Sequence, residues 1–310
     1  MKLISLENTS QADPYIIEHK GEFYIYASGH EGVQLYKSAS LLKDWEYVGI
    51  VAAIAGKMQY WAPSVIELDG KFYMYGSCMD NNRDDVPTQA MHVLCADSPM
   101  GPFTNAKQII PPFSIDSHVV KTDAGLFILY SVNDYEAERA GTYIVVDKML
   151  DPYTPAGEPF SIIRPTLDEE IFQKDRFKKG QHWHTLEGAF YFRIGDRHFI
   201  TYSGNCYASE YYYVGYAVAE TTESDLTKIK FTKYPDENTY LPLLCQDEKE
   251  AGTGHNSILF YDGEYYIFYH GRDIGVQGHE LDSAHSFEDN RTARVKKLVI
   301  DGLKIKAQEI

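Results

Sequence analysis

The stretch that decides the fold is ADPYIIEHKGEFYIYAS, residues 12–28. It consists of a polar start, an apolar strand, a turn that contains glycine and a second strand rich in aromatic residues. Glycine supplies the positive φ that a short hairpin turn needs, so the stretch predicts a β-hairpin. The same pattern recurs four more times: WAPSVIELDGKFYMYGS at 61–77, IDSHVVKTDAGLFILYS at 115–131, LEGAFYFRIGDRHFITYS at 186–203 and HNSILFYDGEYYIFYHG at 255–271.

Further strand-like runs follow most of these hairpins, for example GVQLYKS at 32–38 and YYYVGYAVAE at 211–220. A four-stranded unit of this kind leaves one apolar face uncovered, so neighbouring units must stack to bury it. Five such units predict an all-β, five-bladed β-propeller. The alternatives are a two-sheet sandwich and a mixed α/β domain. No Pro-, Gly- or Ser-rich linker divides the sequence, so we expect one domain over residues 1–310.

Charge and composition argue against several classes of partner. The 310 residues include 29 basic and 45 acidic side chains, a net charge of −16, which argues against nucleic acid and anionic membranes as partners. No apolar run reaches the roughly 18 residues of a membrane span, and the start MKLISLENTSQADP lacks an apolar signal segment. The sequence therefore predicts no membrane association and a cytoplasmic location. Its four cysteines include no Cys-x-x-Cys pair, which argues against a zinc site or a disulfide framework.

One position of the repeat carries the residues that could do chemistry. Counting back eight residues from the turn glycine, or nine in the third hairpin, gives Asp13, Ala62, Asp116, Glu187 and His255. In a propeller the first strand of each blade lines the axis, so we expect these residues to converge at one end of a central channel. Crowded carboxylates repel and desolvate one another, so at least one should have a raised pKa and serve as an acid near neutral pH. This arrangement predicts general acid–base catalysis.

Local structural roles are the alternative for two of these residues. Asp13 precedes Pro14, and Asp-Pro commonly starts a turn. Asp116 precedes Ser117 and could simply cap the start of a strand. Glu187 precedes Gly188 and has no evident capping role. Because the three carboxylates occupy one position of the repeat, we favour the functional interpretation.

Five short motifs occur in order along essentially the whole chain: Ala12-Asp13-Pro14, Trp61-Ala62-Pro63-Ser64-Val65, Ser114-Ile115-Asp116, Leu186-Glu187-Gly188, and Gly254-His255-Asn256-Ser257 with Tyr269-His270-Gly271-Arg272. This ordered set resembles glycoside hydrolase family 43, five-bladed propeller enzymes that remove arabinose or xylose units from plant polysaccharide fragments. It implies that Asp13 is the general base, Glu187 the general acid and Asp116 the carboxylate that orients and tunes Glu187. It also implies inversion at the anomeric carbon.

Further site residues follow from the same resemblance. His255 matches the family's axial histidine, which lies near a water-coordinated calcium or similar ion in many members; a hydrogen-bonded channel histidine without metal is the alternative. Trp61 and Trp183 are candidate stacking faces for sugar rings, with ordinary core or rim packing as the alternative. Arg272 is a candidate to bind a sugar hydroxyl or to pair with Asp116. His255 is also a candidate substrate-binding residue.

The resulting functional prediction is an inverting, exo-acting α-L-arabinofuranosidase that acts on small plant-derived oligosaccharides. Alternatives are a β-xylosidase of the same family, a non-catalytic sugar-binding propeller, and a related propeller of the fructan-hydrolase or mannoside-phosphorylase type. Family members commonly have proline where this sequence has Ala189, and often glycine or proline where it has Ser117. These departures leave the three carboxylates in place but weaken the assignment of the substrate.

Overall fold

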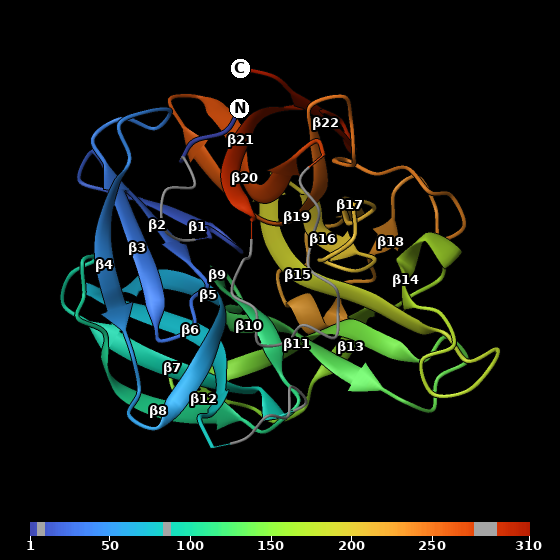
Figure 1. The fold of residues 1–310 in the computed structure, drawn as a ribbon, viewed down its shortest axis with the longest axis horizontal. Helices are drawn as coiled ribbons and strands as arrows, with labels where there is room; N and C mark the ends of the chain where they lie inside the picture. The colour runs from blue at the N-terminus through green and yellow to red at the C-terminus, as the bar shows by residue number, and fades with distance from the viewer. Residues whose placement is uncertain (5–9, 83–87, 276–289) are drawn as a thin grey trace.

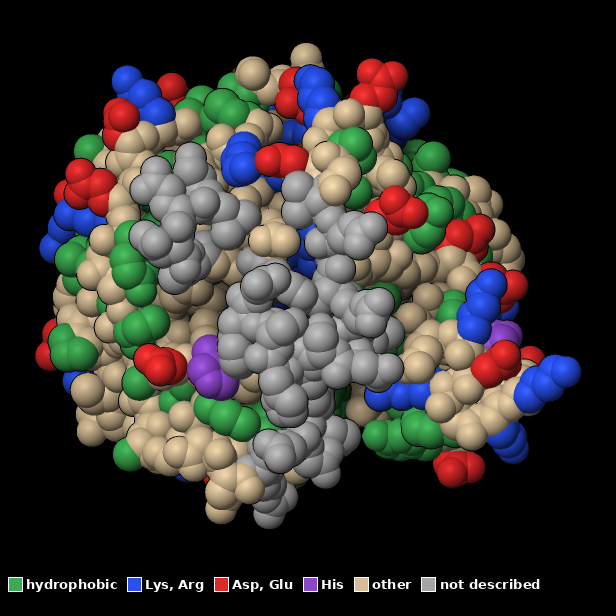
Figure 2. All heavy atoms as spheres, in the orientation of Figure 1, with side chains coloured by type: hydrophobic (Ala, Val, Ile, Leu, Met, Phe, Trp, Pro, Cys, Tyr) green, Lys and Arg blue, Asp and Glu red, His purple; other side chains and the backbone are tan. Residues whose placement is uncertain are grey.

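The computed structural model describes residues 1–4, 10–82, 88–275 and 290–310. Within these ranges the protein has 22 β-strands, two short 3-10 helices and no α-helix, so the fold is all-β (Figure 1). No helix in the described part of the chain is long and apolar enough to cross a membrane. Acidic and basic side chains are scattered over the face of the molecule drawn in Figure 2.

Three of the four sheets are simple antiparallel meanders of four strands, paired in chain order. The first contains β1 (Tyr15–His19), β2 (Glu22–Ala27), β3 (Val33–Ser38) and β4 (Glu46–Ala52). The second contains β5 (Lys57–Leu68), β6 (Lys71–Asp80), β7 (Ala90–Ala96) and β8 (Thr104–Ile110). The last contains β19 (Glu250–Tyr261), β20 (Glu264–Asp273), β21 (Thr292–Asp301) and β22 (Lys304–Gln308).

The fourth sheet has ten strands and combines the third and fourth repeats. Its first half contains β9 (Ile115–Thr122), β10 (Gly125–Asp134), β11 (Gly141–Asp151), β12 (Thr154–Pro155) and β13 (Phe160–Ile163). Its second half contains β14 (Ile171–Gln173), β15 (Trp183–Ile194), β16 (Arg197–Gly204), β17 (Tyr213–Glu220) and β18 (Thr232–Lys233). A short parallel pairing of β11 with β15 joins the halves, with Gly141 opposite His184 and Thr142 opposite Thr185. A Cβ on Gly141 would lie 2.1 Å from the His184 carbonyl oxygen, so this contact requires glycine.

The five predicted hairpins form between β1 and β2, β5 and β6, β9 and β10, β15 and β16, and β19 and β20. In the first hairpin His19 pairs with Glu22, leaving the two-residue turn Lys20-Gly21. Both turn residues have positive φ, 54° and 79°, as expected for the turn type that matches strand twist. The hairpin prediction from the sequence is therefore confirmed.

Inner strands such as β2 and β7 are buried on both faces because hydrophobic clusters lie on each side of a sheet, whereas the outer strands β4 and β8 are largely exposed. Successive side chains point to opposite faces, so Ile25 packs in one cluster and Tyr26 in another. Five clusters each join neighbouring repeats, and they contain respectively Tyr26 and Met74, Tyr75 and Ile128, Leu129 and Ile200, Phe199 and Ile267, and Phe268 and Ile25. The last cluster packs the final sheet against the first.

The first strands of the five hairpins lie near the middle of the molecule in Figure 1. Here β1 contacts β5, β5 contacts β9, β9 contacts β15, β15 contacts β19, and β19 contacts β1. The polar starts of these strands are thereby brought to the centre of the molecule, although they are far apart in the sequence.

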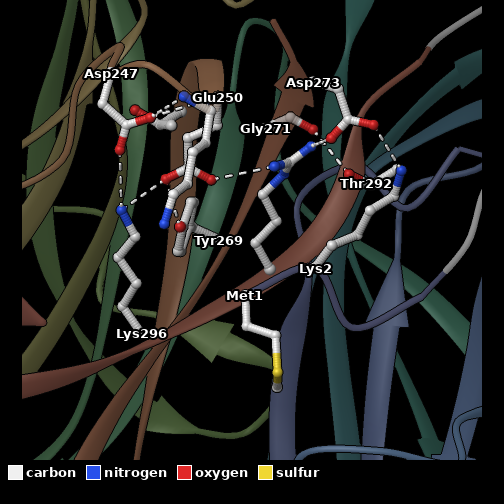
Figure 3. A network of polar contacts seen from close by, with 12 residues as sticks. Met1, Lys2, Asp247, Glu250, Tyr269, Gly271, Asp273, Thr292 and Lys296 are labelled. Carbon is white, nitrogen blue, oxygen red and sulfur yellow. Dashed lines mark hydrogen bonds and ion pairs between the residues drawn. The ribbon is translucent and has the colours of Figure 1, made fainter. Parts of the chain in front are cut away.

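The N-terminal segment is attached to the last sheet along β21. Backbone hydrogen bonds join Leu3 to Ala293, Val295 to Met1, and Gln11 to Arg291. A network of charged side chains reinforces this attachment and is drawn in Figure 3: Lys2 pairs with Asp273, Asp273 with Arg294, Arg294 with Glu250, and Glu250 with Lys296. The attachment places Asp13, two residues after Gln11, close to Arg291.

Candidate active site

The structure brings the four ionisable residues of the repeat position together. The Nδ1 atom of His255 lies 3.6 Å from Oδ1 of Asp13 and 3.8 Å from Oδ2 of Asp116. The charges of Asp13 and Glu187 both act on Asp116, which places Glu187 in the same cluster. Asp13 and Asp116 are buried, with 8% and 6% of their surfaces exposed. These side chains therefore lie together as expected, while the central channel and their catalytic roles stay predictions.

The backbone φ angles show that one residue was assigned to the wrong position of the repeat. Asp13, Ala62, Asp116 and His255 all have left-handed φ values, between 44° and 59°, but in the fourth unit the left-handed residue is Gly188, with φ 63°. The prediction that Glu187 occupies the shared position was therefore wrong by one residue. The reason lies in the turn.

In the fourth hairpin Ile194 pairs with Arg197, so the turn is Gly195-Asp196. Its glycine is the first turn residue, whereas in the first hairpin Gly21 is the second. Counting back from the glycine consequently gives Glu187 instead of Gly188. The glycine at this position lets the chain pass close to His255, because a Cβ on Gly188 would lie 3.0 Å from Nδ1 of that ring.

Asp13 is held by donors on both carboxylate oxygens. The hydroxyl of Ser28 donates to Oδ2 at 2.5 Å, and Nη1 of Arg291 lies 3.2 Å from Oδ1. Burial by itself would raise the pKa of Asp13, but Arg291, His255 and His270 outweigh it and hold the pKa well below its usual value. Asp13 is therefore an ionised carboxylate near neutral pH, as a general base must be.

His270 contacts the backbone of Asp13. The backbone N–H of Asp13 donates to Nδ1 of His270 at 3.1 Å. Burial, together with the nearby charge of Arg291, lowers the pKa of His270 to about 3. The ring is accordingly neutral near pH 7, and its Nδ1, which also lies 3.2 Å from Oδ1 of Asp13, holds the segment that carries Asp13.

Glu187 lies in an environment of the opposite kind. Burial raises its pKa to about 7; the hydrogen bond from Tyr212 lowers it, Asp13 raises it and Arg291 lowers it. The Tyr212 hydroxyl donates to Oε1 of Glu187 at 2.8 Å. Glu187 is thus a carboxyl group that retains a proton at a pH where Asp13 has lost its own, which suits a general acid.

Asp116 is the third carboxyl group of the cluster. Burial and the charges of Glu187 and Asp13 raise its pKa well above the usual value, although the backbone N–H of Gly188 donates to it and lowers the pKa. Because the charge of Glu187 is one cause of this rise, ionisation of one of the two groups disfavours ionisation of the other. Asp116 is therefore placed to influence the proton on Glu187.

The predicted substrate-binding residues lie in different surroundings. Trp61 is partly exposed, next to Ala62, whose N–H donates to the same Ser28 hydroxyl that holds Asp13. Trp183 is only 4% exposed, with its ring 5.0 Å from that of Tyr135. Both sugar-stacking roles stay predictions.

Arg272 is buried, and its Nη1 donates to the Tyr207 carbonyl at 3.0 Å. Its predicted contact with a sugar hydroxyl stays a prediction.

Three contributors to the site were missed by the sequence analysis. Arg291 supplies the positive charge beside Asp13, Tyr212 the hydroxyl on Glu187, and Ser28 the hydroxyl on Asp13. Ser28 had a detectable signal, because it ends the first repeat phrase. Arg291 and Tyr212 lie outside the repeat phrases, so no pattern marked them.

The surroundings of His255 bear on the predicted calcium ion. Among the residues that the structure describes, no three His, Cys, Asp or Glu side chains form a group suited to hold a metal ion. Calcium takes six to eight oxygen ligands, so an ion beside His255 would have to take most of its ligands from water. The calcium site stays a prediction.

An ionised carboxylate next to a carboxyl group of raised pKa is the equipment of acid–base hydrolases that cleave glycosidic bonds. The sequence model of "Glycosyl hydrolases family 43" matches residues 6–302. The chain belongs to this family.

Two curated relatives and one solved structure illustrate the similarity. An "Extracellular exo-alpha-(1->5)-L-arabinofuranosidase" of Streptomyces avermitilis is 27% identical over 93% of this chain and 59% of its own length. A "Beta-xylosidase" of Xylanibacter ruminicola is 27% identical over 68% of this chain and 65% of its own length. The crystal structure of a thermostable family-43 glycoside hydrolase superposes with a TM-score of 0.76, at 28% identity, covering 98% of this chain and 94% of that one. The chain thus spans about three fifths of the length of the Streptomyces relative.

Proposed function

We propose that this chain is an inverting glycoside hydrolase that removes terminal arabinose units from plant-derived oligosaccharides, an exo-acting α-L-arabinofuranosidase. The observation that carries the proposal is the difference in pKa between two carboxyl groups of the same cluster. The pKa of Asp13 lies well below its usual value, while that of Glu187 is raised to about 7. Between these two values one group is a base and the other an acid, as single-step hydrolysis requires.

In the proposed reaction a water molecule attacks the anomeric carbon while its proton passes to the Asp13 carboxylate. The bond from that carbon to the glycosidic oxygen breaks, and Glu187 gives its proton to the departing oxygen. Asp13 then releases its proton to solvent and Glu187 regains one, which restores both groups. Asp116, whose pKa the charge of Glu187 helps to raise, has the role of orienting and tuning Glu187.

The choice of arabinose is supported by the Streptomyces relative, which is named as an exo-acting arabinofuranosidase. The relative named as a β-xylosidase supports the second candidate. Nitrophenyl α-L-arabinofuranoside and nitrophenyl β-D-xyloside, compared side by side under identical conditions, separate the two. We expect faster release from the arabinofuranoside; faster release from the xyloside would favour the second candidate, and release from neither would refute both.

We also propose that the fold is a closed, five-bladed β-propeller in a single domain covering residues 1–310. Support comes from the cyclic order of contacts among β1, β5, β9, β15 and β19, and from the cluster that packs the last sheet against the first. In this interpretation the ten-stranded sheet is two blades joined at the β11–β15 pairing. A single calorimetric unfolding transition is expected, whereas two separate transitions would indicate two domains.

Location and metal content are further proposals. We propose a cytoplasmic enzyme acting on small oligosaccharides, although the Streptomyces relative is named as extracellular; fractionation of the source cells decides between these locations.

We propose that a calcium ion near His255 has a structural role. Elemental analysis of the purified protein and a melting temperature that falls on chelation would support it, and an unchanged melting temperature without bound calcium would refute it.

A further inference from the structure

Tyr212 is linked to both catalytic candidates, directly to Glu187 and through His270 to Asp13. It is 1% exposed, and its hydroxyl donates to Oε1 of Glu187 at 2.8 Å. Its ring lies parallel to the imidazole of His270, with centroids 5.7 Å apart and an interplanar angle of 7°. His270 in turn accepts the backbone N–H of Asp13. Tyr212 therefore touches the acid through its hydroxyl and the support of the base through its ring.

The position of the Tyr212 ring is fixed by the backbone beside it. A Cβ on Gly254 would lie 1.9 Å from Cε1 of Tyr212, so the ring packs directly on the bare glycine. The hydroxyl of Thr253 also donates to the Tyr212 carbonyl at 3.5 Å. Packed on Gly254 and stacked with His270, the ring presents its hydroxyl to Glu187.

The hydrogen bond has a direct chemical consequence for Glu187. A tyrosine hydroxyl has one proton to donate, and here it is donated to Oε1. Burial and the charge of Glu187 raise the pKa of Tyr212 well above its usual value, so the hydroxyl keeps this proton. A proton carried by Glu187 is therefore favoured on Oε2, and the carboxylate left after its transfer still has a donor on Oε1.

We propose that Tyr212 is the positioning residue of the acid: its hydroxyl directs the transferable proton of Glu187 to Oε2 and stabilises the carboxylate formed when that proton leaves. This inference rests on the proposed function of Glu187. It predicts that loss of the hydroxyl weakens the acid while leaving the base in place, since among the described residues the link from Tyr212 to Asp13 runs through the ring of His270.

The direction of the effect follows from the charged and titratable groups around Glu187 in the part of the chain that the structure describes. These are Asp13 before β1, Asp116 on β9, Cys206 and Tyr212 between β16 and β17, His255 on β19, and Arg291 before β21. Burial and Asp13 raise the pKa of Glu187, whereas Tyr212 and Arg291 lower it. Removing the Tyr212 hydroxyl takes away one of the two influences that favour the carboxylate, so the pKa of Glu187 rises.

Tyr212→Phe tests the proposal, because phenylalanine keeps the ring on His270 and Gly254 and removes only the hydroxyl. Tyr213→Phe is the matched control: Tyr213 is also buried, and among the described residues its hydroxyl has no hydrogen-bond partner. Carboxyl ¹³C NMR of glutamate-labelled protein follows the titration, with the Glu187 signal assigned by Glu187→Gln. We expect the Glu187 pKa to rise by about one unit in Tyr212→Phe and to stay in place in Tyr213→Phe. An unchanged pKa in Tyr212→Phe would overturn the inference, and this measurement does not depend on hydrolysis.

Kinetics supply the second readout. In Tyr212→Phe the alkaline limb of kcat/KM should move up by about one pH unit, while the acidic limb stays. Because a good leaving group needs little protonation, kcat should fall roughly tenfold on an oligosaccharide and much less on a nitrophenyl glycoside. Equal losses on both substrates with an unmoved alkaline limb would indicate a merely structural role and refute the proposal. A wild-type enzyme that hydrolyses neither substrate would instead refute the proposed function.

Discussion

Replacing Arg291 with glutamine should move the whole pH profile of hydrolysis to higher pH. The guanidinium lies 3.2 Å from Oδ1 of Asp13, and both side chains are nearly buried. It is the nearby charge with the largest lowering effect on the pKa of Asp13, and it also lowers the pKa of Glu187. Without it, both groups hold their protons to higher pH.

The expected size follows from the separation of the charges. Two unit charges about 4 Å apart interact by about 4 kcal/mol at an effective dielectric constant of about 20, which corresponds to roughly three pKa units. His255, His270 and Ser28 remain around Asp13 in the variant, so we expect a rise of about two units for Asp13. For Glu187, the charge of Arg291 is the smallest of the four influences on the pKa, so its rise should be smaller.

The assay is kcat/KM for nitrophenyl α-L-arabinofuranoside measured from acid to alkaline pH. The base must be ionised, so a higher Asp13 pKa removes activity on the acid side first. Arg197→Gln is the control, because Arg197 donates to the Gly302 carbonyl at an exposed position. An acidic limb that stays in place in Arg291→Gln would refute the assignment of Asp13 as the base held ionised by Arg291.

Two other substitutions test the acid and the backbone around it. Glu187→Gln should lower kcat on an oligosaccharide at least about a hundredfold while calorimetric binding of the same ligand persists; retained turnover would show that another group is the acid. Gly188→Ala should lower both kcat and the melting temperature, because this residue has φ 63° and a Cβ would lie 3.0 Å from the His255 ring. Gly180→Ala is its control, since Gly180 has φ 83° but open space around the Cβ position; equal losses in the two variants would mean that contact with His255 is unimportant.

The repeat phrases predicted most of the fold and the residues at the centre of the site. Tight glycine turns and alternating aromatic strands are local signals, so the five hairpins were predictable from short stretches. Repetition then indicated that the starts of the first strands converge, and Asp13, Asp116 and His255 do meet. The pairing of two repeats into one sheet was not predictable, because the contact of Gly141 with His184 depends on how neighbouring units pack.

The remaining site residues depend on contacts that no local pattern marks. Arg291 contacts Asp13 across 278 positions of the chain, and it precedes β21 instead of opening a repeat phrase. Tyr212 is one of three successive tyrosines, and nothing in the sequence distinguishes the one that contacts Glu187. The position of Glu187 was predicted one residue out of register, because the sequence does not show whether Gly195 is the first or the second residue of its turn.

The central claim is that ionised Asp13 activates the attacking water while Glu187 protonates the departing oxygen. Proton NMR of an α-linked arabino-oligosaccharide, recorded from the first moments of hydrolysis, tests it most directly. We predict that the β-anomer of arabinose appears first with the wild type, and that Asp13→Asn produces almost no sugar. Initial release of the α-anomer, or undiminished release by Asp13→Asn, would contradict the account.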